Sequence, residues 1–249
     1  MLACLVVLAL PTASAATFTV SSTADSGPGS LRAAVAAAQT SPGPSLIQFA
    51  QGVRGTIVLT SGAIAISQSL TIAGPGAHRL SISGNDADRV FDIEGSSATN
   101  VSISGMKIKH GVASSSSPHG SSGGAIYVSG AMLTLAGVVL SRNRAIDSVG
   151  GTAEGGAVAI VGNGAVNASD VTVQRNRALS SSGGAALGGG LFVDATSSLS
   201  LSDSLVTLND ALGSPGIGGG VYTLGTFSFD ASTTISGNTA STSANDIGP

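Results

Sequence analysis

Short alternations of apolar and polar residues run along most of this chain from Leu46 onward. Segments such as Leu70-Thr-Ile72, Leu80-Ser-Ile82 and Val101-Ser-Ile103 place two aliphatic residues two positions apart, and Gly, Pro, Asn and Asp separate the segments. Alternation with period two is typical of a strand with one buried face, and the separating residues are turn formers. The pattern therefore predicts many short strands joined by tight turns.

The alternations belong to a repeat of about thirty residues. In the second half, each unit opens with a glycine block and closes with an asparagine, and these asparagines lie 33, 33 and 29 residues apart: Asn143, Asn176, Asn209 and Asn238. Six coils align on the strands that begin at Leu70, Val101, Leu133, Val166, Leu199 and Phe227. A fixed period whose units consist of short strands predicts a solenoid.

Three short strands and three turns fit into each coil, which predicts a triangular rung paired with its neighbours by parallel ladders. The expected fold class is all-β, a right-handed single-stranded parallel β-helix. Equivalent residues then stack in inward columns, one of Ile126, Val158, Leu191 and Val221 and another of Ile72, Ile103, Leu135, Ala168, Leu201 and Phe229. Ser- and Gly-rich insertions at 113–122, 146–153, 179–186 and 212–217 are expected to be loops that project from one edge.

One segment has a helical pattern instead. Leu31, Val35 and Ala38 lie at helical spacing within residues 31–39, and Ser30 is a candidate N-cap. We expect this helix to cover the open end of the first coil and to shield its strand edge. The mature chain then consists of an N-terminal strand and helical cap at 17–45 and of coils at 46–249.

The first sixteen residues have another character. An apolar stretch at 2–10 is followed by small residues that end in Ser14-Ala15-Ala16. This is typical of a secretory signal peptide, so residues 1–16 are expected to be cleaved and the protein to be secreted or displayed at the cell surface. The alternative is a buried N-terminal strand. No other stretch is long enough for a transmembrane helix.

Several motifs are shared with a known group of proteins. They are the Asp25-Ser-Gly-Pro-Gly-Ser-Leu-Arg-Ala-Ala-Val35 segment, Ile47-Gln-Phe49, the Leu70-Thr-Ile-Ala-Gly-Pro-Gly76 turn and the Gly-Gly blocks with a downstream Asn. In these the chain resembles secreted right-handed parallel β-helix proteins of bacteria, in particular the polymorphic outer-membrane-protein repeat group. The chain departs from that group by placing Arg, Leu or Gly where its repeats usually carry Phe. The resemblance implies a fold and surface display rather than an activity.

Composition narrows the possible functions. Only 9% of the residues are charged, and a net charge of -3 with a pI near 5.4 provides no general attraction for nucleic acid. Cys4 is the one cysteine, so there is no thiolate cluster. The three histidines, His78, His110 and His119, do not have the spacing of a metal site. We therefore expect no cofactor and no metal.

Two polar columns follow from the alignment. The asparagines at 143, 176, 209 and 238 recur at one turn and are interpreted as a structural ladder. A basic stripe is aligned one position earlier and consists of Arg79, His110, Arg142 and Arg175. With rungs about 4.8 Å apart, it would span roughly 15 Å and suit the anionic groups of an extended ligand. Alternatively, these side chains lie singly in solvent and protect a flat edge from aggregation.

A column of aromatic residues is the second candidate binding surface. Tyr127, Phe192 and Tyr222 follow inward positions of the glycine-block strands, with Ala159 in the intervening coil. Alternation predicts that they point outward, where their rings could stack on sugars or on another protein. A shift of one residue would place them in the core instead.

The resulting functional hypothesis is an exported module for adhesion or for binding a polysaccharide or a protein. One alternative is a polysaccharide lyase or glycoside hydrolase, which requires carboxylates converging in a cleft. The acids are mostly scattered along the sequence: Asp92 and Glu94 share a strand, and the local cluster of Asp86, Asp88 and Arg89 is interpreted as a solvated turn. A second alternative is a structural spacer without a specific ligand.

Overall fold

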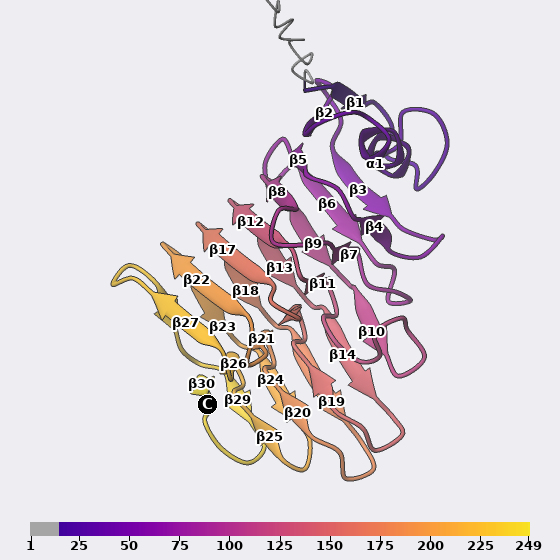
Figure 1. The fold of residues 1–249 in the computed structure, drawn as a ribbon. Helices are drawn as coiled ribbons and strands as arrows, with labels where there is room; N and C mark the ends of the chain where they lie inside the picture. The colour runs from indigo at the N-terminus through magenta and orange to yellow at the C-terminus, as the bar shows by residue number, and fades with distance from the viewer. Residues whose placement is uncertain (1–14) are drawn as a thin grey trace, which may run out of the picture.

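The chain winds into a parallel β-solenoid of about seven turns, and one short helix, the only one among residues 15–249, lies at the first coil (Figure 1). The computed structural model describes residues 15–249, so the predicted signal peptide lies almost entirely outside the described residues. Within 15–249, no helix has the length and apolar character needed to cross a membrane. The all-β solenoid prediction is confirmed, while the right-handed winding stays a prediction.

Three long parallel sheets form the walls of the solenoid. The first contains β1 (Thr17–Val20), β2 (Ser45–Phe49), β5 (Leu70–Ala73), β8 (Asn100–Ser104), β12 (Met132–Ala136), β17 (Ala165–Ser169), β22 (Ser198–Ser202) and β27 (Thr226–Phe229). The second contains β3 (Gly55–Val58), β6 (Leu80–Ser83), β9 (Lys107–Lys109), β13 (Val139–Ser141), β18 (Thr172–Gln174), β23 (Leu205–Thr207) and β28 (Thr234–Ile235). The third contains β4 (Ile64–Ile66), β7 (Phe91–Glu94), β11 (Ile126–Ser129), β16 (Val158–Val161), β21 (Leu191–Val193), β26 (Val221–Thr223) and β30 (Ile247–Gly248).

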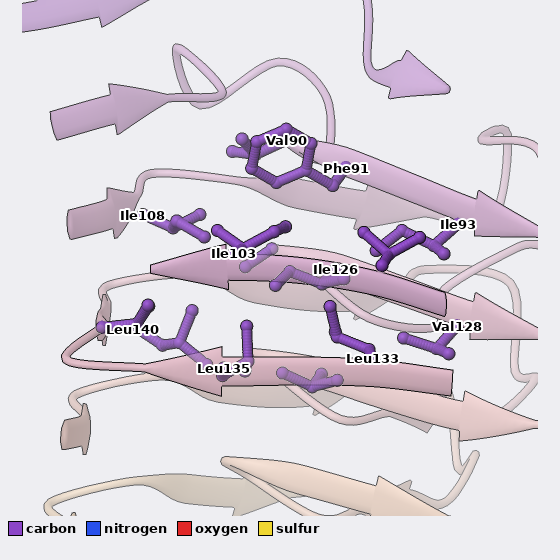
Figure 2. Packing of buried hydrophobic residues seen from close by; sticks show 14 of the residues in the cluster. Val90, Phe91, Ile93, Ile103, Ile108, Ile126, Val128, Leu133, Leu135 and Leu140 are labelled. Atoms are coloured by element: carbon purple, nitrogen blue, oxygen red, sulfur yellow. The ribbon is translucent and has the colours of Figure 1, made fainter. Parts of the chain in front are cut away.

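The strand register confirms the six-coil alignment. Leu70 pairs with Val101, and the same ladder continues through Leu133, Val166, Leu199 and Phe227. Because a parallel ladder keeps equivalent residues on one face, aliphatic side chains stack inside the solenoid, as Figure 2 shows for Ile103 and Leu135. Phe229 belongs to the same column but is 50% exposed, because β27 is the last strand of its sheet.

The predicted helix is α1 (Leu31–Gln39), and it covers the first coil as expected (Figure 1). The Ser30 hydroxyl accepts a hydrogen bond from the amide of Ala33 at 3.2 Å, which makes Ser30 the N-cap. Leu31 and Val35 are buried against β1, β2 and β4. Asp25 accepts two hydrogen bonds from Arg32 and one from the amide of Thr60, so the segment before the helix is tied to the first coil.

The insertions are more ordered than the sequence suggested. Each begins in a fourth sheet of β10 (Val112–Ser114), β14 (Arg144–Asp147), β19 (Arg177–Ser180), β24 (Asp210–Leu212) and β29 (Thr239–Ala240). Three of them end in a fifth sheet of β15 (Ala153–Glu154), β20 (Ala186–Leu187) and β25 (Gly216–Ile217). A separate core of small side chains lies between the two sheets: Ala145, Ala153, Ala178, Ala186 and Ala211. Most residues of the predicted insertions are loops as expected, but short strands frame them, and small alanine side chains let the two sheets pack closely enough to form a flange.

Candidate functional site

The predicted asparagines stack as a buried ladder where the second and fourth sheets meet. Asn143 Nδ2 donates to Asn176 Oδ1 at 2.9 Å, and the same bond joins Asn176 to Asn209 and Asn209 to Asn238. Each Nδ2 also donates to a backbone carbonyl, and each of the three acceptor oxygens takes a second hydrogen bond from a backbone amide. Every polar atom of the central side chains is thus satisfied, as buried amides require.

Arginines flank the ladder on both sides. Because Asn143 and Asn176 point inward, the residues before and after each of them point outward. In two successive coils both flanking residues are arginines: Arg142, Arg144, Arg175 and Arg177. Sequence reasoning selected Arg142 and Arg175 but missed Arg144 and Arg177, although the Arg-Asn-Arg tripeptide together with an inward Asn contained the signal.

These side chains border an open groove of about 580 Å³, which we call the arginine groove. It is lined by Asp86, His110, Arg142, Arg144, Arg175, Arg177, Leu208 and Asp210. Arg144 Nη2 lies 2.9 Å from Asp86 Oδ1, and Arg177 Nη2 lies 3.2 Å from Asp210 Oδ2. Within residues 15–249, no carboxylate forms an ion pair with Arg142 or Arg175. The groove therefore has two cationic side chains available for a ligand.

The backbone at the groove turns is unusual. His110, Arg142, Arg175 and Leu208 occupy equivalent positions with φ of 52°, 57°, 55° and 56°, and glycine stands at this position in the last coil as Gly237, with φ 71°. A left-handed conformation costs a residue with a Cβ roughly 1 kcal/mol relative to glycine. Three of the four residues other than glycine at this position are His or Arg and the fourth is Leu208, so the turn accepts both cationic and apolar side chains.

Arg79 does not belong to this stripe, so that prediction was wrong. Ser83 pairs with Lys109, and the residue opposite His110 is therefore Gly84. The six residues 74–79 separate β5 from β6, whereas two residues separate β8 from β9, and the longer turn displaces Arg79. Arg79 instead lines a different surface depression of about 440 Å³ together with Arg54.

The aromatic column faces away from the core but is not an open platform. Tyr127 pairs with Ala159, and Phe192 pairs with Tyr222, in the predicted register. Phe192 is only 5% exposed and Ala159 is fully buried, while Tyr127 and Tyr222 are half-buried. The Phe192 and Tyr222 rings stack at 5.8 Å. The expected exposed aromatic surface is therefore interrupted, because the outward face of the third sheet is itself covered here.

Arg89 accounts for part of this cover and corrects a further prediction. Its side chain is 1% exposed rather than part of a solvated turn, and it donates hydrogen bonds to the carbonyls of Pro118 and Ser122 at 2.6 and 2.9 Å. The guanidinium also lies 5.4 Å from the centre of the Tyr127 ring. Burial lowers the pKa of Arg89, and the nearby Asp92 and Asp88 carboxylates oppose that shift. Arg89 thus anchors the 113–122 insertion over the third sheet.

The anchored insertion places a histidine beside two carboxylates. His119 Nε2 lies 3.5 Å from Asp92 Oδ2 and contacts Glu94 Oε1, and its ring stacks on Tyr127 at 4.3 Å. Burial raises the pKa of the Asp92 carboxyl, although the Arg89 charge opposes the shift. No metal-ligand spacing is visible in the sequence, because Asp92 and His119 lie on different segments that only the folded insertion brings together.

Comparison with known proteins found no matching family model and no curated protein with similar sequence. The chain is, by its structure, a parallel β-helix protein.

Proposed function

We propose that this protein is an exported β-helix module that binds an extended acidic polysaccharide in the arginine groove. The observation that carries the proposal is the array of four arginines on two successive rungs, of which Arg142 and Arg175 have no carboxylate partner within the described chain. The planar guanidinium matches carboxylate and sulfate groups through paired hydrogen bonds. The partner is therefore a chain that carries such groups at regular intervals.

The geometry suits a polymer better than a compact ligand. The groove is open to solvent and runs across several rungs, which repeat about every 4.8 Å along the solenoid. The two arginine rungs, one with Arg142 and Arg144 and the other with Arg175 and Arg177, offer similar contacts, so both can contribute to the affinity for an extended chain. Because the arginines are largely exposed, each contact is modest and depends on salt.

The residues of the groove favour ligand binding rather than catalysis. Its two carboxylates, Asp86 and Asp210, each pair with an arginine, and they belong to different coils. A lyase or glycosidase needs an acid and a base on either side of one sugar linkage. The spacer hypothesis, in turn, does not require arginines on both sides of the ladder in two successive rungs.

Export supports an extracellular polysaccharide as the partner. The apolar stretch and the small residues of positions 1–16 have the pattern of a signal peptide. The glycine and asparagine repeat also resembles that of the polymorphic outer-membrane-protein group, whose members are displayed on bacterial surfaces. Adhesion to a glycan-coated surface is the role that combines both features.

Titration calorimetry at low and high salt tests the proposal. The purified chain would be titrated with polygalacturonate as the carboxylated polymer, heparin as the sulfated polymer and dextran as the neutral one. We expect binding to at least one acidic polymer, weakened at 0.5 M NaCl, and none to dextran. Assays for released reducing ends and unsaturated products on the same polymers should stay negative, and product release would instead identify an enzyme.

Substitution in the groove provides the matched comparison. Asn tolerates the left-handed conformation, so the Arg142→Asn/Arg175→Asn double variant removes two charges without adding backbone strain. At about 1 kcal/mol, or roughly fivefold, for each exposed ionic contact, its affinity should fall by about 25-fold. The Arg54→Asn/Arg79→Asn variant, which removes the same charge outside the groove, should bind nearly normally. An equal loss of affinity in both variants would show that binding depends only on net charge, and it would overturn the assignment of the site to the groove.

A further inference from the structure

A second site lies where the 113–122 insertion contacts β7 through His119. We propose that Asp92, Glu94 and His119 bind one divalent transition-metal ion of the zinc class. One ligand atom from each residue lies within 4.8 Å of the other two. Tetrahedral zinc sites with bonds of 2.0–2.2 Å keep their ligand atoms about 3.3–3.5 Å apart, so small side-chain rotations close the site.

The three side chains are held by rigid supports. Asp92 and Glu94 lie two positions apart on the outward face of β7, a strand that is paired on both sides by β4 and β11. His119 belongs to the insertion that the buried Arg89 fixes through the carbonyls of Pro118 and Gly120. Stacking on Tyr127 orients the imidazole ring. Ligands that are positioned before the ion arrives lose little entropy on binding.

The local charge favours a cation. Asp88 and Asp92 lie near the single positive charge of Arg89, and Glu94 lies near Asp92, so three carboxylates face one guanidinium. In addition, Asp92 Oδ1 is buried and has no hydrogen-bond partner among the described residues. A buried acceptor without a partner is costly, and bidentate binding of the carboxylate to an ion would satisfy it.

The ligand types indicate which metals fit. One imidazole nitrogen and two carboxylate oxygens suit Zn²⁺ or Mn²⁺, whereas Ca²⁺ and Mg²⁺ prefer oxygen ligands throughout. With one ligand atom from each residue, a tetrahedral ion keeps a fourth position, which the second oxygen of Asp92 or a water molecule can occupy. Because His119 comes from the insertion and the carboxylates come from β7, a bound ion ties the insertion to the third sheet.

Calorimetry and thermal unfolding on the metal-free chain test this site. A Cys4→Ser background prevents the thiol from supplying a site of its own. We expect one Zn²⁺ per chain with a micromolar or lower Kd, weaker binding of Mn²⁺ and no measurable binding of Ca²⁺. At Zn²⁺ concentrations 100 times Kd, the melting temperature should rise by about 5 °C or more, and EDTA should reverse the rise.

His110 offers a matched control, because its side chain is 33% exposed and contacts one carboxylate, that of Asp86, while the His119 side chain is 30% exposed. His119→Gln and Glu94→Gln should each weaken Zn²⁺ binding tenfold or more, and His110→Gln should leave it unchanged. All three substitutions are at partly exposed side chains, and metal-free melting temperatures check that each variant folds. Failure of the parent chain to bind Zn²⁺, or binding that survives in His119→Gln, would overturn the site. Neither His119 nor Glu94 lines the arginine groove, and Zn²⁺ binding is the measured quantity, so the result is independent of polysaccharide binding; His110, which does line the groove, serves only as the control.

Discussion

At the scale of single residues, the asparagine ladder shows how one side chain can serve several coils. Asn176 accepts from the amide and the Nδ2 of Asn143 and donates to Leu140 O and Asn209 Oδ1. All four hydrogen bonds are buried, so removing the side chain leaves their partners in a dry interior. An unsatisfied buried polar group costs about 1–3 kcal/mol.

Asn176→Ala should therefore lower the free energy of unfolding by about 3–5 kcal/mol, since more than one partner loses its hydrogen bond. Urea unfolding followed by circular dichroism measures the loss. Asn167→Ala is the control, because Asn167 belongs to the same coil but is exposed on β17. Its effect should stay within about 0.5 kcal/mol. Similar losses at both positions would contradict a structural role of the ladder.

At the scale of elements, the helical cap is joined to the solenoid by polar contacts as well as by its apolar face. Arg32 donates to Asp25 and also to the carbonyls of Gly62 and Ala63 at 2.6 and 2.8 Å. Burial alone would raise the pKa of Asp25, but hydrogen bonds from Ser61, Arg32 and Thr60 outweigh it and lower the pKa to about 2. The ionised carboxylate therefore holds the cap on the first coil.

The stability that Asp25 contributes should depend on pH. Because its folded pKa of about 2 lies below the ordinary 3.8, the contribution is complete above about pH 4 and is lost as the pH falls toward 2. Asp25→Asn should cost about 1–2 kcal/mol at pH 6, with solvent screening limiting the value, and almost nothing near pH 2. Thermal unfolding across this range measures the difference. A cost for Asp25→Asn that stays constant between pH 6 and pH 2 would exclude the charged contact.

At the scale of the whole molecule, stability depends on the position of a residue along the solenoid. Each rung packs only against the rungs before and after it, so inner rungs bury both faces and a terminal rung buries one. Leu201 and Phe229 occupy neighbouring positions of one inward column, yet Leu201 is 2% exposed and Phe229 is 50% exposed. Residues at equivalent positions of the repeat therefore differ in burial, and so in how much they stabilise the fold.

Leu201→Ala should lower the free energy of unfolding by about 2–5 kcal/mol through loss of packing and a residual cavity. Phe229→Ala removes a larger side chain but should cost less than about 1 kcal/mol, because that ring is already half in solvent. Chemical denaturation of both variants tests this order. A larger loss for Phe229→Ala would show that something covers the final rung in solution.

The amino-acid sequence by itself determined the solenoid, its period and its register. In a parallel ladder, each strand pairs with the equivalent strand one repeat later, so spacing along the chain translates directly into neighbours in space. This is why the column from Leu70 to Phe227, the inward asparagines and the capped helix at 31–39 could all be predicted. The error at Arg79 arose where one turn is longer than its equivalents.

Only the tertiary structure decided what surrounds the solenoid walls. The flange forms because two short sheets pack closely on alanine side chains. Alanine is compatible with such packing, but its presence in the sequence does not predict it. Likewise, contacts of the 113–122 insertion with Arg89 and β7 contribute to the burial of Arg89 and His119. The position of this insertion does not follow from the repeat. Register is local to the repeat and can be read from sequence, whereas burial and convergence of side chains depend on contacts between segments without a common period.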